Sequence, residues 1–154
     1  MISLLNGEKV QMIITKITDY NEIMHNEDIR RIISYAMYQP TAGKIQNIAQ
    51  SIYAKQQGRF YIAIEDEKIV GVIGLKKIDN VRLEIMHIAV AEDMRGKGIG
   101  KKMIQEALVL DDVKEITAET DADAKRFYKK CGFTIKKMPD KGYGVARYLC
   151  TLAK

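Results

Sequence analysis

The sequence predicts an α/β or α+β domain in which helices flank a mixed central β-sheet. Two observations support this prediction. Segments with apolar residues at helical spacing alternate with short apolar runs typical of strands. One near-continuous apolar run, 82–90, suits a central strand that is covered on both faces. With 154 residues, two prolines and no internal repeat, we expect a single domain over residues 1–154.

The first predicted elements are one strand and two helices. A short strand is expected around residues 12–16. The spacing of apolar residues predicts a helix over 26–37, with Asn26 as its N-cap. A proline then interrupts the pattern, and Thr41 can cap a second helix over 41–53.

Three strands and a helix follow. The runs 60–64 and 69–75 flank a polar turn, which predicts a β-hairpin. The apolar run 82–90 supplies the next strand. It leads through a glycine-rich turn at 95–100 into a helix that extends to Leu110.

The last predicted elements are a strand, a helix and two strands. Residues 115–120 form the strand, and 121–131 form a helix that Gly132 ends at the C′ position. Residues 133–137 and 145–152 are expected to pair as antiparallel strands.

The glycine-rich turn, RGKGIG, is the most informative motif of the chain. Its glycines allow close approach of a ligand to the backbone, and its cations favour an anion at the start of the following helix. A Walker A motif is excluded because Lys102 stands where Ser or Thr is required. A dinucleotide motif is excluded because Lys101 occupies the last glycine position. The turn alone leaves a phosphate site and a purely structural turn equally open.

Two motifs in the correct order decide between these readings. The turn matches the pattern R/Q-x-x-G-x-G/A, and an alanine, an aromatic-Tyr pair and a Gly-Phe pair follow further along the chain. The matching residues are Arg95, Gly98, Gly100, Ala124, Phe127, Tyr128, Gly132 and Phe133. Over residues 58–135 the chain therefore resembles the GNAT superfamily of N-acetyltransferases, which use acetyl-CoA.

The resemblance implies a GNAT-like acyl-CoA N-acyltransferase fold in which two parallel strands splay apart. Those strands would be 84–90 and 115–120, and the pantetheine arm of acetyl-CoA would lie between them. Peptide groups left without a sheet partner would bind its amides, and the turn would bind its pyrophosphate. The implied cofactor-binding residues are Ile88, Ala89, Val90, Arg95, Gly96, Lys97, Gly98, Ile99, Gly100 and Lys101.

The resemblance also implies the chemistry, which is direct attack of a primary amine on the thioester of acetyl-CoA. Tyr128 would be the general acid and Glu84 the candidate general base. The alternative for Glu84 is a strand carboxylate paired with a lysine. His87 follows Glu84 by an odd number of residues, so a regular strand would place it on the opposite face as a structural residue.

Some residues depart from the family pattern or have a structural interpretation. Many members carry Asn where this chain has Asp121, whose carboxylate would be unfavourable near the phosphates of the cofactor. Cys131 is interpreted as a core residue at a helix end. Three tyrosines of the early helices either belong to the core, which we expect, or form the wall of the acceptor site: Tyr35, Tyr38 and Tyr53.

Composition and charge bear on which other functions and partners are open to the protein. The formal net charge of +5 allows nucleic-acid binding, but cations and acids are mixed over most of the chain. Two alternative functions stay open: a non-catalytic acyl-CoA-binding or regulatory domain, and a nucleic-acid-binding module. We expect no nucleic-acid partner, and an acceptor that is a small-molecule or peptide amine. The resemblance also allows a homodimer through the C-terminal strands.

Location and metal content are likewise expectations. The chain has two cysteines and no CxxC spacing, which favours reduced thiols in a cytoplasmic protein. No apolar run approaches the roughly 20 residues that span a bilayer, so no membrane association is expected. The two histidines have no ligand spacing, so we expect no metal.

Overall fold

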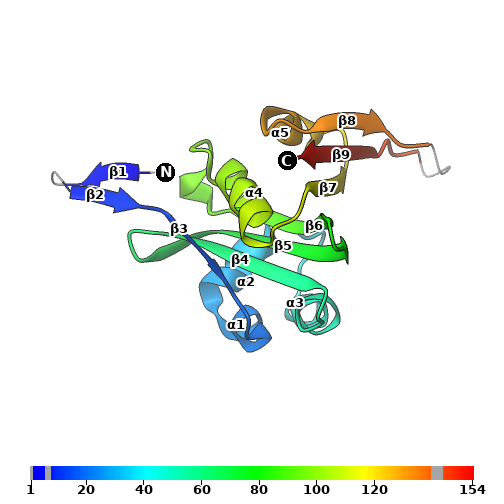
Figure 1. Ribbon diagram of the computed structural model, residues 1–154. Helices are drawn as coiled ribbons and strands as arrows, with labels where there is room; N and C mark the ends of the chain where they lie inside the picture. The colour runs from blue at the N-terminus through cyan, green and yellow to red at the C-terminus, as the bar shows by residue number, and fades with distance from the viewer. Residues whose placement is uncertain (1, 6–7, 140–143) are drawn as a thin grey trace.

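The computed structural model describes residues 2–5, 8–139 and 144–154. Its centre is a seven-stranded sheet in the order β3-β4-β5-β6-β7-β9-β8 (Figure 1). The strands are β3 (Ile13–Lys16), β4 (Gly58–Glu65), β5 (Lys68–Asp79), β6 (Arg82–Val90), β7 (Glu115–Thr120), β9 (Tyr148–Ala153) and β8 (Thr134–Lys137). Neighbouring strands are antiparallel except β6 and β7, which are parallel. The predicted mixed sheet is confirmed.

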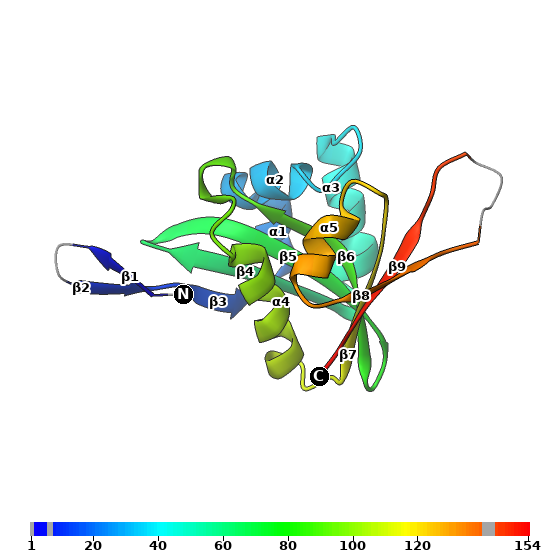
Figure 2. The same ribbon diagram turned by 90° about the horizontal axis from the view of Figure 1, so that it is seen from above.

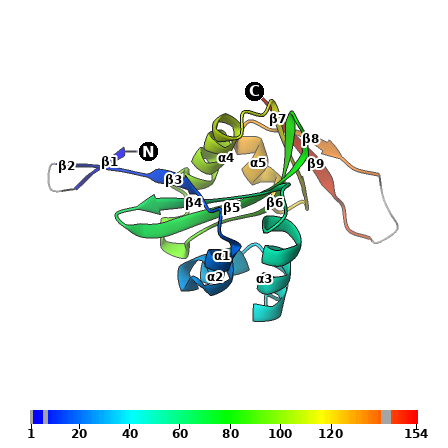
Figure 3. The same cartoon turned by 60° about the horizontal axis from the view of Figure 1, so that its bottom comes forward.

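Helices cover both faces of the sheet (Figure 3). One face carries α1 (Tyr20–His25), α2 (Glu27–Ser34), α3 (Ala42–Ile48) and the π-helical turn η1 (Ala49–Tyr53). The other carries α4 (Ile99–Leu110) and α5 (Lys125–Lys130), and a short 3-10 turn, η2 (Glu92–Met94), precedes α4. No helix in the described ranges is long and apolar enough to cross a membrane.

The predicted caps of the early helices are confirmed, but the helices differ in extent. The Asn26 side chain accepts a hydrogen bond from the Ile29 N–H at 3.0 Å, and Thr41 Oγ1 accepts one from the Lys44 N–H at 3.1 Å. Helix α1, capped by Asp19, was not predicted. It has only six residues, too few for a helical pattern to be recognised in the sequence.

The N-terminal ribbon and the C-terminal elements also depart from the prediction. Strands β1 (Ile2–Leu5) and β2 (Glu8–Gln11) form a separate antiparallel pair that the sequence did not reveal. Helix α5 starts at Lys125 and not at 121, because the Asp121 side chain accepts from the Ala124 N–H and holds the preceding residues in a turn. Strand β9 pairs antiparallel with β8, as predicted, but also inserts between β7 and β8 (Figure 2).

Strands β6 and β7 separate after a short stretch of pairing. Their register joins Arg82 to Glu115, Leu83 to Ile116 and Glu84 to Thr117, and no pair is formed beyond Glu84 in the described chain. The rest of β6 is paired only with β5, and the rest of β7 only with β9. One edge of β6 is therefore left with free backbone N–H and C=O groups. The predicted splay of two parallel strands is present.

A β-bulge lies in β6 at the point where the splay begins. Ile85 is opposite Leu75 and His87 is opposite Gly74, so Met86 is an extra residue. The bulge changes which residues of β6 point to each face of the sheet. Leu83 and Ile85 pack with α4 and α5, whereas Ala89, beyond the bulge, packs with the helices of the other face.

Candidate active site

A groove of about 1120 Å³ occupies the opening between β6 and β7. The turn that follows α2, residues 35–37, lines it from one face of the sheet, and α4 and α5 line it from the other. The wall between them is the backbone and side chains of β6 from Ile85 to Val90. The predicted residues Ile88, Ala89 and Val90 therefore lie in the groove.

The glycine turn forms one end of the groove. Gly96 and Gly98 have φ of +77° and +80°, and a Cβ at either position would have no atom within 4 Å. The turn thus needs glycine for its conformation and leaves its backbone open. Gly98 is the N-cap of α4 and provides no side-chain hydrogen bond, so N–H groups of the first turn are free to bind an anion.

Four cations line the groove: Arg95, Lys101, Arg126 and Lys130. Arg95 is held in place, since its Nε donates to the Val90 carbonyl at 3.1 Å and its guanidinium lies 4.9 Å from the centre of the Tyr35 ring. Lys97, also predicted to bind the cofactor, does not line the groove; its Nζ lies 3.7 Å from Met94 Sδ. Arg126 and Lys130 belong to the basic segment KRFYKK, whose charge excess already suited a compact multi-phosphate ligand, and the packing of α5 brings them to the groove.

Tyr128 is a buried core residue that also lines the groove. Its ring is 6% exposed and makes edge-to-face contacts with Phe127 and Phe133, at centroid distances of 5.1 and 5.2 Å. Its hydroxyl has no hydrogen-bond partner among the described residues and is not sealed from solvent. Burial, with smaller contributions from Cys150 and Cys131, raises the pKa of Tyr128 well above its usual range. The phenol is therefore protonated at neutral pH.

Asp121 and Cys131 also line the groove. Asp121 lines the groove, but its Oδ1 accepts from the Ala124 N–H at 2.9 Å and so starts the turn into α5. Cys131 is 8% exposed, belongs to the core and also lines the groove. Burial raises the pKa of its thiol, which disfavours a thiolate nucleophile.

Glu84 and His87 lie on the same face of the sheet, contrary to the expectation for a regular strand. The bulge at Met86 is the reason, because it inserts one residue between them. Glu84 is opposite Lys76 and does not line the groove, and no ion pair joins the two side chains in the described structure. His87 does line the groove. The role of Glu84 as a base stays a prediction.

The three tyrosines of the early helices have different environments. Tyr53 is 8% exposed and in the core, as expected. Tyr35 and Tyr38 are 40% and 84% exposed, so their assignment to the core was wrong. Tyr35 lines the groove beside Arg95. The sequence held a signal for this, since Tyr35 falls outside the apolar stripe of its helix.

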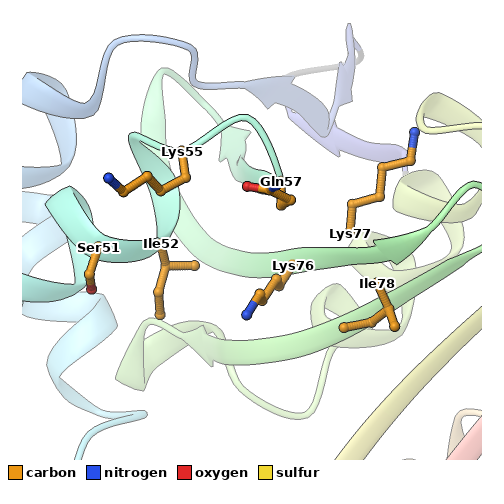
Figure 4. A pocket seen from close by; sticks show the side chains of 7 residues that line it. All are labelled: Ser51, Ile52, Lys55, Gln57, Lys76, Lys77 and Ile78. Atoms are coloured by element: carbon orange, nitrogen blue, oxygen red, sulfur yellow. The ribbon is translucent and has the colours of Figure 1, made fainter.

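A second hollow, of about 500 Å³, lies between η1 and β5 (Figure 4). Its lysines do not converge on a common point: Lys55, Lys76 and Lys77 extend in different directions. Lys76 and Lys77 are neighbours on one strand, and neighbours point to opposite faces. The groove is the better candidate for chemistry.

The fold thus places a splayed parallel pair of strands and a glycine-rich helix start at one groove. The family model described as the acetyltransferase (GNAT) domain matches residues 56–135, just over half of the chain. The chain belongs to the GNAT acetyltransferase family.

Relatives and solved structures agree with this assignment. A protein of Bacillus methanolicus described as an uncharacterized N-acetyltransferase in the lysA 3′ region is 26% identical over 100 residues, which are 65% of this chain and 82% of that protein. YvbK of Bacillus subtilis, also described as an uncharacterized N-acetyltransferase, is 31% identical over 87 residues, which are 53% of this chain and 56% of that one. A GNAT acetyltransferase structure from Elizabethkingia anophelis with acetyl-CoA bound has a TM-score of 0.66 at 20% identity, covering 93% of this chain and 98% of the other. At that identity the likeness shows the fold alone.

Proposed function

We propose that the protein transfers the acetyl group of acetyl-CoA to a primary amine by direct attack. The observation that carries the proposal is the splay of β6 from β7, which exposes the backbone of β6 to a groove that ends at the glycine turn. A backbone edge can bind the amides of the pantetheine arm, and a free helix start can bind the pyrophosphate.

The residues present suit acetyl-CoA. Along Ile88, Ala89 and Val90, β6 pairs with β5 on one edge only, so its other edge is open to the groove, where the Val90 carbonyl accepts from Arg95 Nε. The side chains of these residues need only be apolar. The turn from Arg95 to Lys101 would hold the pyrophosphate through backbone N–H groups and positive charge. Arg126 and Lys130 add charge on the opposite wall. When bound, acetyl-CoA supplies an activated acetyl group as a thioester.

Tyr128 is proposed as the general acid. The reaction forms a nitrogen–carbon bond, breaks the carbon–sulfur bond and leaves a thiolate that takes up a proton. Tyr128 offers a protonated hydroxyl in the groove with no competing partner among the described residues. This open hydroxyl also favours catalysis over the alternative of a domain that only binds acyl-CoA.

The attacking amine must be neutral. A lysine-like amine, with a pKa near 10.4, is neutral in only about one molecule in 2,500 at pH 7, so holding it neutral costs about 4.6 kcal/mol. A general base reduces this cost, and Glu84 is our candidate, acting through water because its side chain does not line the groove. The cations gathered in the groove suit a compact polyphosphate ligand better than nucleic acid.

The acceptor is proposed to be a small-molecule or peptide amine. Three other points stay proposals: one domain over residues 1–154, a cytoplasmic location, and pairing of two copies through the C-terminal strands. None of them affects the chemistry of the groove.

Two measurements test the proposed function. Acetyl-CoA at 100 times its dissociation constant should stabilise the fold by about 2.7 kcal/mol, seen as a rise in melting temperature. A screen of amines and peptides should then release free CoA with at least one acceptor. A melting shift with ATP or NAD but none with acetyl-CoA would refute the assignment, and tight sequence-dependent binding of duplex DNA would favour the nucleic-acid module.

A further inference from the structure

His87 is turned toward the acceptor side of the groove by the bulge at Met86. Beyond the bulge it faces the side of the sheet that α1, α2 and α3 cover, where the turn after α2 lines the groove. Gly74 lies opposite it on β5, and the Tyr53 ring covers Gly74 so closely that a Cβ there would overlap its hydroxyl. This glycine makes room for Tyr53 to reach His87.

The contact between Tyr53 and His87 fixes the imidazole. The Tyr53 hydroxyl and His87 Nδ1 are 2.5 Å apart, and the rings meet edge to face. Burial raises the pKa of Tyr53 far above its usual range, so the hydroxyl keeps its proton. It has no other acceptor among the described residues, so it donates to Nδ1 and the ring proton is left on Nε2.

The other ring nitrogen is free to act in the groove. Nε2 lies on the opposite edge of the imidazole from Nδ1, makes no hydrogen bond to the described residues and is not a buried unpaired atom. Because His87 lines the groove, its Nε2–H is a fixed donor there. The fixed proton leaves Nε2 without the lone pair that a general base needs.

We propose, resting on the acetyltransferase function above, that His87 positions the acceptor by donating a hydrogen bond from Nε2–H to an oxygen next to the reactive amine. Burial lowers the pKa of His87 to about 4, so the ring is uncharged at neutral pH and does not repel a cationic substrate. On the face of the sheet that His87 shares, the groove is lined by the apolar side chains of Ala36 and Met37, and Met86 of β6 also lines it. The substrate class is therefore an amine with an adjacent carbonyl oxygen and an apolar side chain, as in an α-amino amide or a peptide N-terminus.

A pair of acceptors tests the proposal: leucinamide and isoamylamine, which has the same skeleton without the carboxamide. The two amines differ in basicity, so the quantity compared is the ratio of their kcat/KM values in each variant. In His87→Asn the amide can still accept from Tyr53 but has no donor at the Nε2 position. We expect this variant to lower kcat/KM for leucinamide about tenfold and to leave isoamylamine within about twofold, as the loss of one hydrogen bond predicts.

His87→Gln is the matched control, because its amide N–H lies near the position of Nε2. It should keep most of the activity with leucinamide. An equal loss with both acceptors in His87→Asn would mean that His87 only supports the fold, and it would overturn the proposal. A wild type that accepts isoamylamine or spermidine but not leucinamide would overturn it too.

Nitrogen NMR of histidine-labelled protein supplies a readout that needs no turnover. The chain has two histidines, so comparison with the His87→Gln variant assigns the signal. The proton should be on Nε2, and Tyr53→Phe should allow both tautomers. A proton on Nδ1 in the wild type would overturn the proposal while leaving the acetyltransferase function intact. If no amine releases CoA from the wild type, the acetyltransferase function itself fails, and this inference fails with it.

Discussion

Replacing Tyr128 by Phe should slow acetyl transfer while leaving the fold and acetyl-CoA binding nearly unchanged. The substitution removes only the hydroxyl, and the ring keeps its edge-to-face contacts with Phe127 and Phe133. No described residue loses a hydrogen-bond partner, so the free energy of unfolding should change by less than about 0.5 kcal/mol.

The expected loss of rate follows from what the hydroxyl does. General acid catalysis contributes about 10² to 10⁴ in rate. We expect the low end, because a thiolate with a pKa near 8.5 already leaves readily and water can replace the acid. A loss of about 10² corresponds to about 2.7 kcal/mol of barrier. Because burial raises the pKa of Tyr128, the wild type should show no loss from its ionisation between pH 7 and 10.

Tyr61→Phe is a matched control with the opposite expectation. Tyr61 is also buried, but its hydroxyl donates to Asp111. The Asp111 carboxylate forms an ion pair with Arg59, with 2.8 Å between Oδ1 and Nε, and neither residue lines the groove. Removing that hydroxyl leaves a carboxylate oxygen without its donor. The variant should lose about 2 kcal/mol of stability, the usual worth of a hydrogen bond to a charged group, and keep its rate.

The assays are steady-state release of CoA with the acceptor found in the screen, calorimetric binding of acetyl-CoA, and urea unfolding. A Tyr128→Phe rate within about twofold of the wild type, far below the usual effect of acid catalysis, would show that Tyr128 only packs. Loss of both rate and acetyl-CoA affinity would assign the hydroxyl to cofactor binding. Loss of rate alone supports the general acid.

Three more predictions test the groove and its surroundings. Gly100→Asp should abolish acetyl-CoA binding in a folded protein, since a Cβ there would lie 2.9 Å from the Phe127 ring and the carboxylate would repel the pyrophosphate; unchanged affinity by calorimetry would make the turn purely structural. Glu84→Gln should lower turnover near neutral pH and recover as pH rises, because the acceptor then loses its proton unaided; a profile parallel to the wild type would contradict a role as base. His87 has a folded pKa of about 4 against 6.5 when unfolded, so between these values the unfolded chain binds more protons and stability falls by up to about 3 kcal/mol as pH falls. Urea unfolding at pH 7 and 4.5 measures this loss, which His87→Gln should remove.

Local patterns determined the elements that lie within a few residues of their signals. Asn26 and Thr41 were recognised as caps because a cap bonds to an N–H three residues ahead. Gly132, with φ of +93°, was recognised as the end of α5 because a left-handed residue there favours glycine. The glycine turn and Tyr128 were located by the spacing of two motifs, which the chain carries in its linear order.

The sequence by itself thus determined the class of fold, the family, the starts of α2 and α3 and the position of the anion-binding turn, all of which depend on neighbours along the chain. Only the tertiary structure decided which side chains share the groove. The extra residue Met86 places the His87 side chain on the opposite face of the sheet from the one that a regular strand would give it. The bulge is recognised only from the pairing of His87 with Gly74 on the neighbouring strand. Tyr35 contacts Arg95, and Arg126 lines the wall of the groove that α5 forms, because the helices pack onto different faces of the sheet. Such contacts depend on the register of strands and on helix packing, which are set by the burial of many side chains at once and leave no local pattern in the sequence.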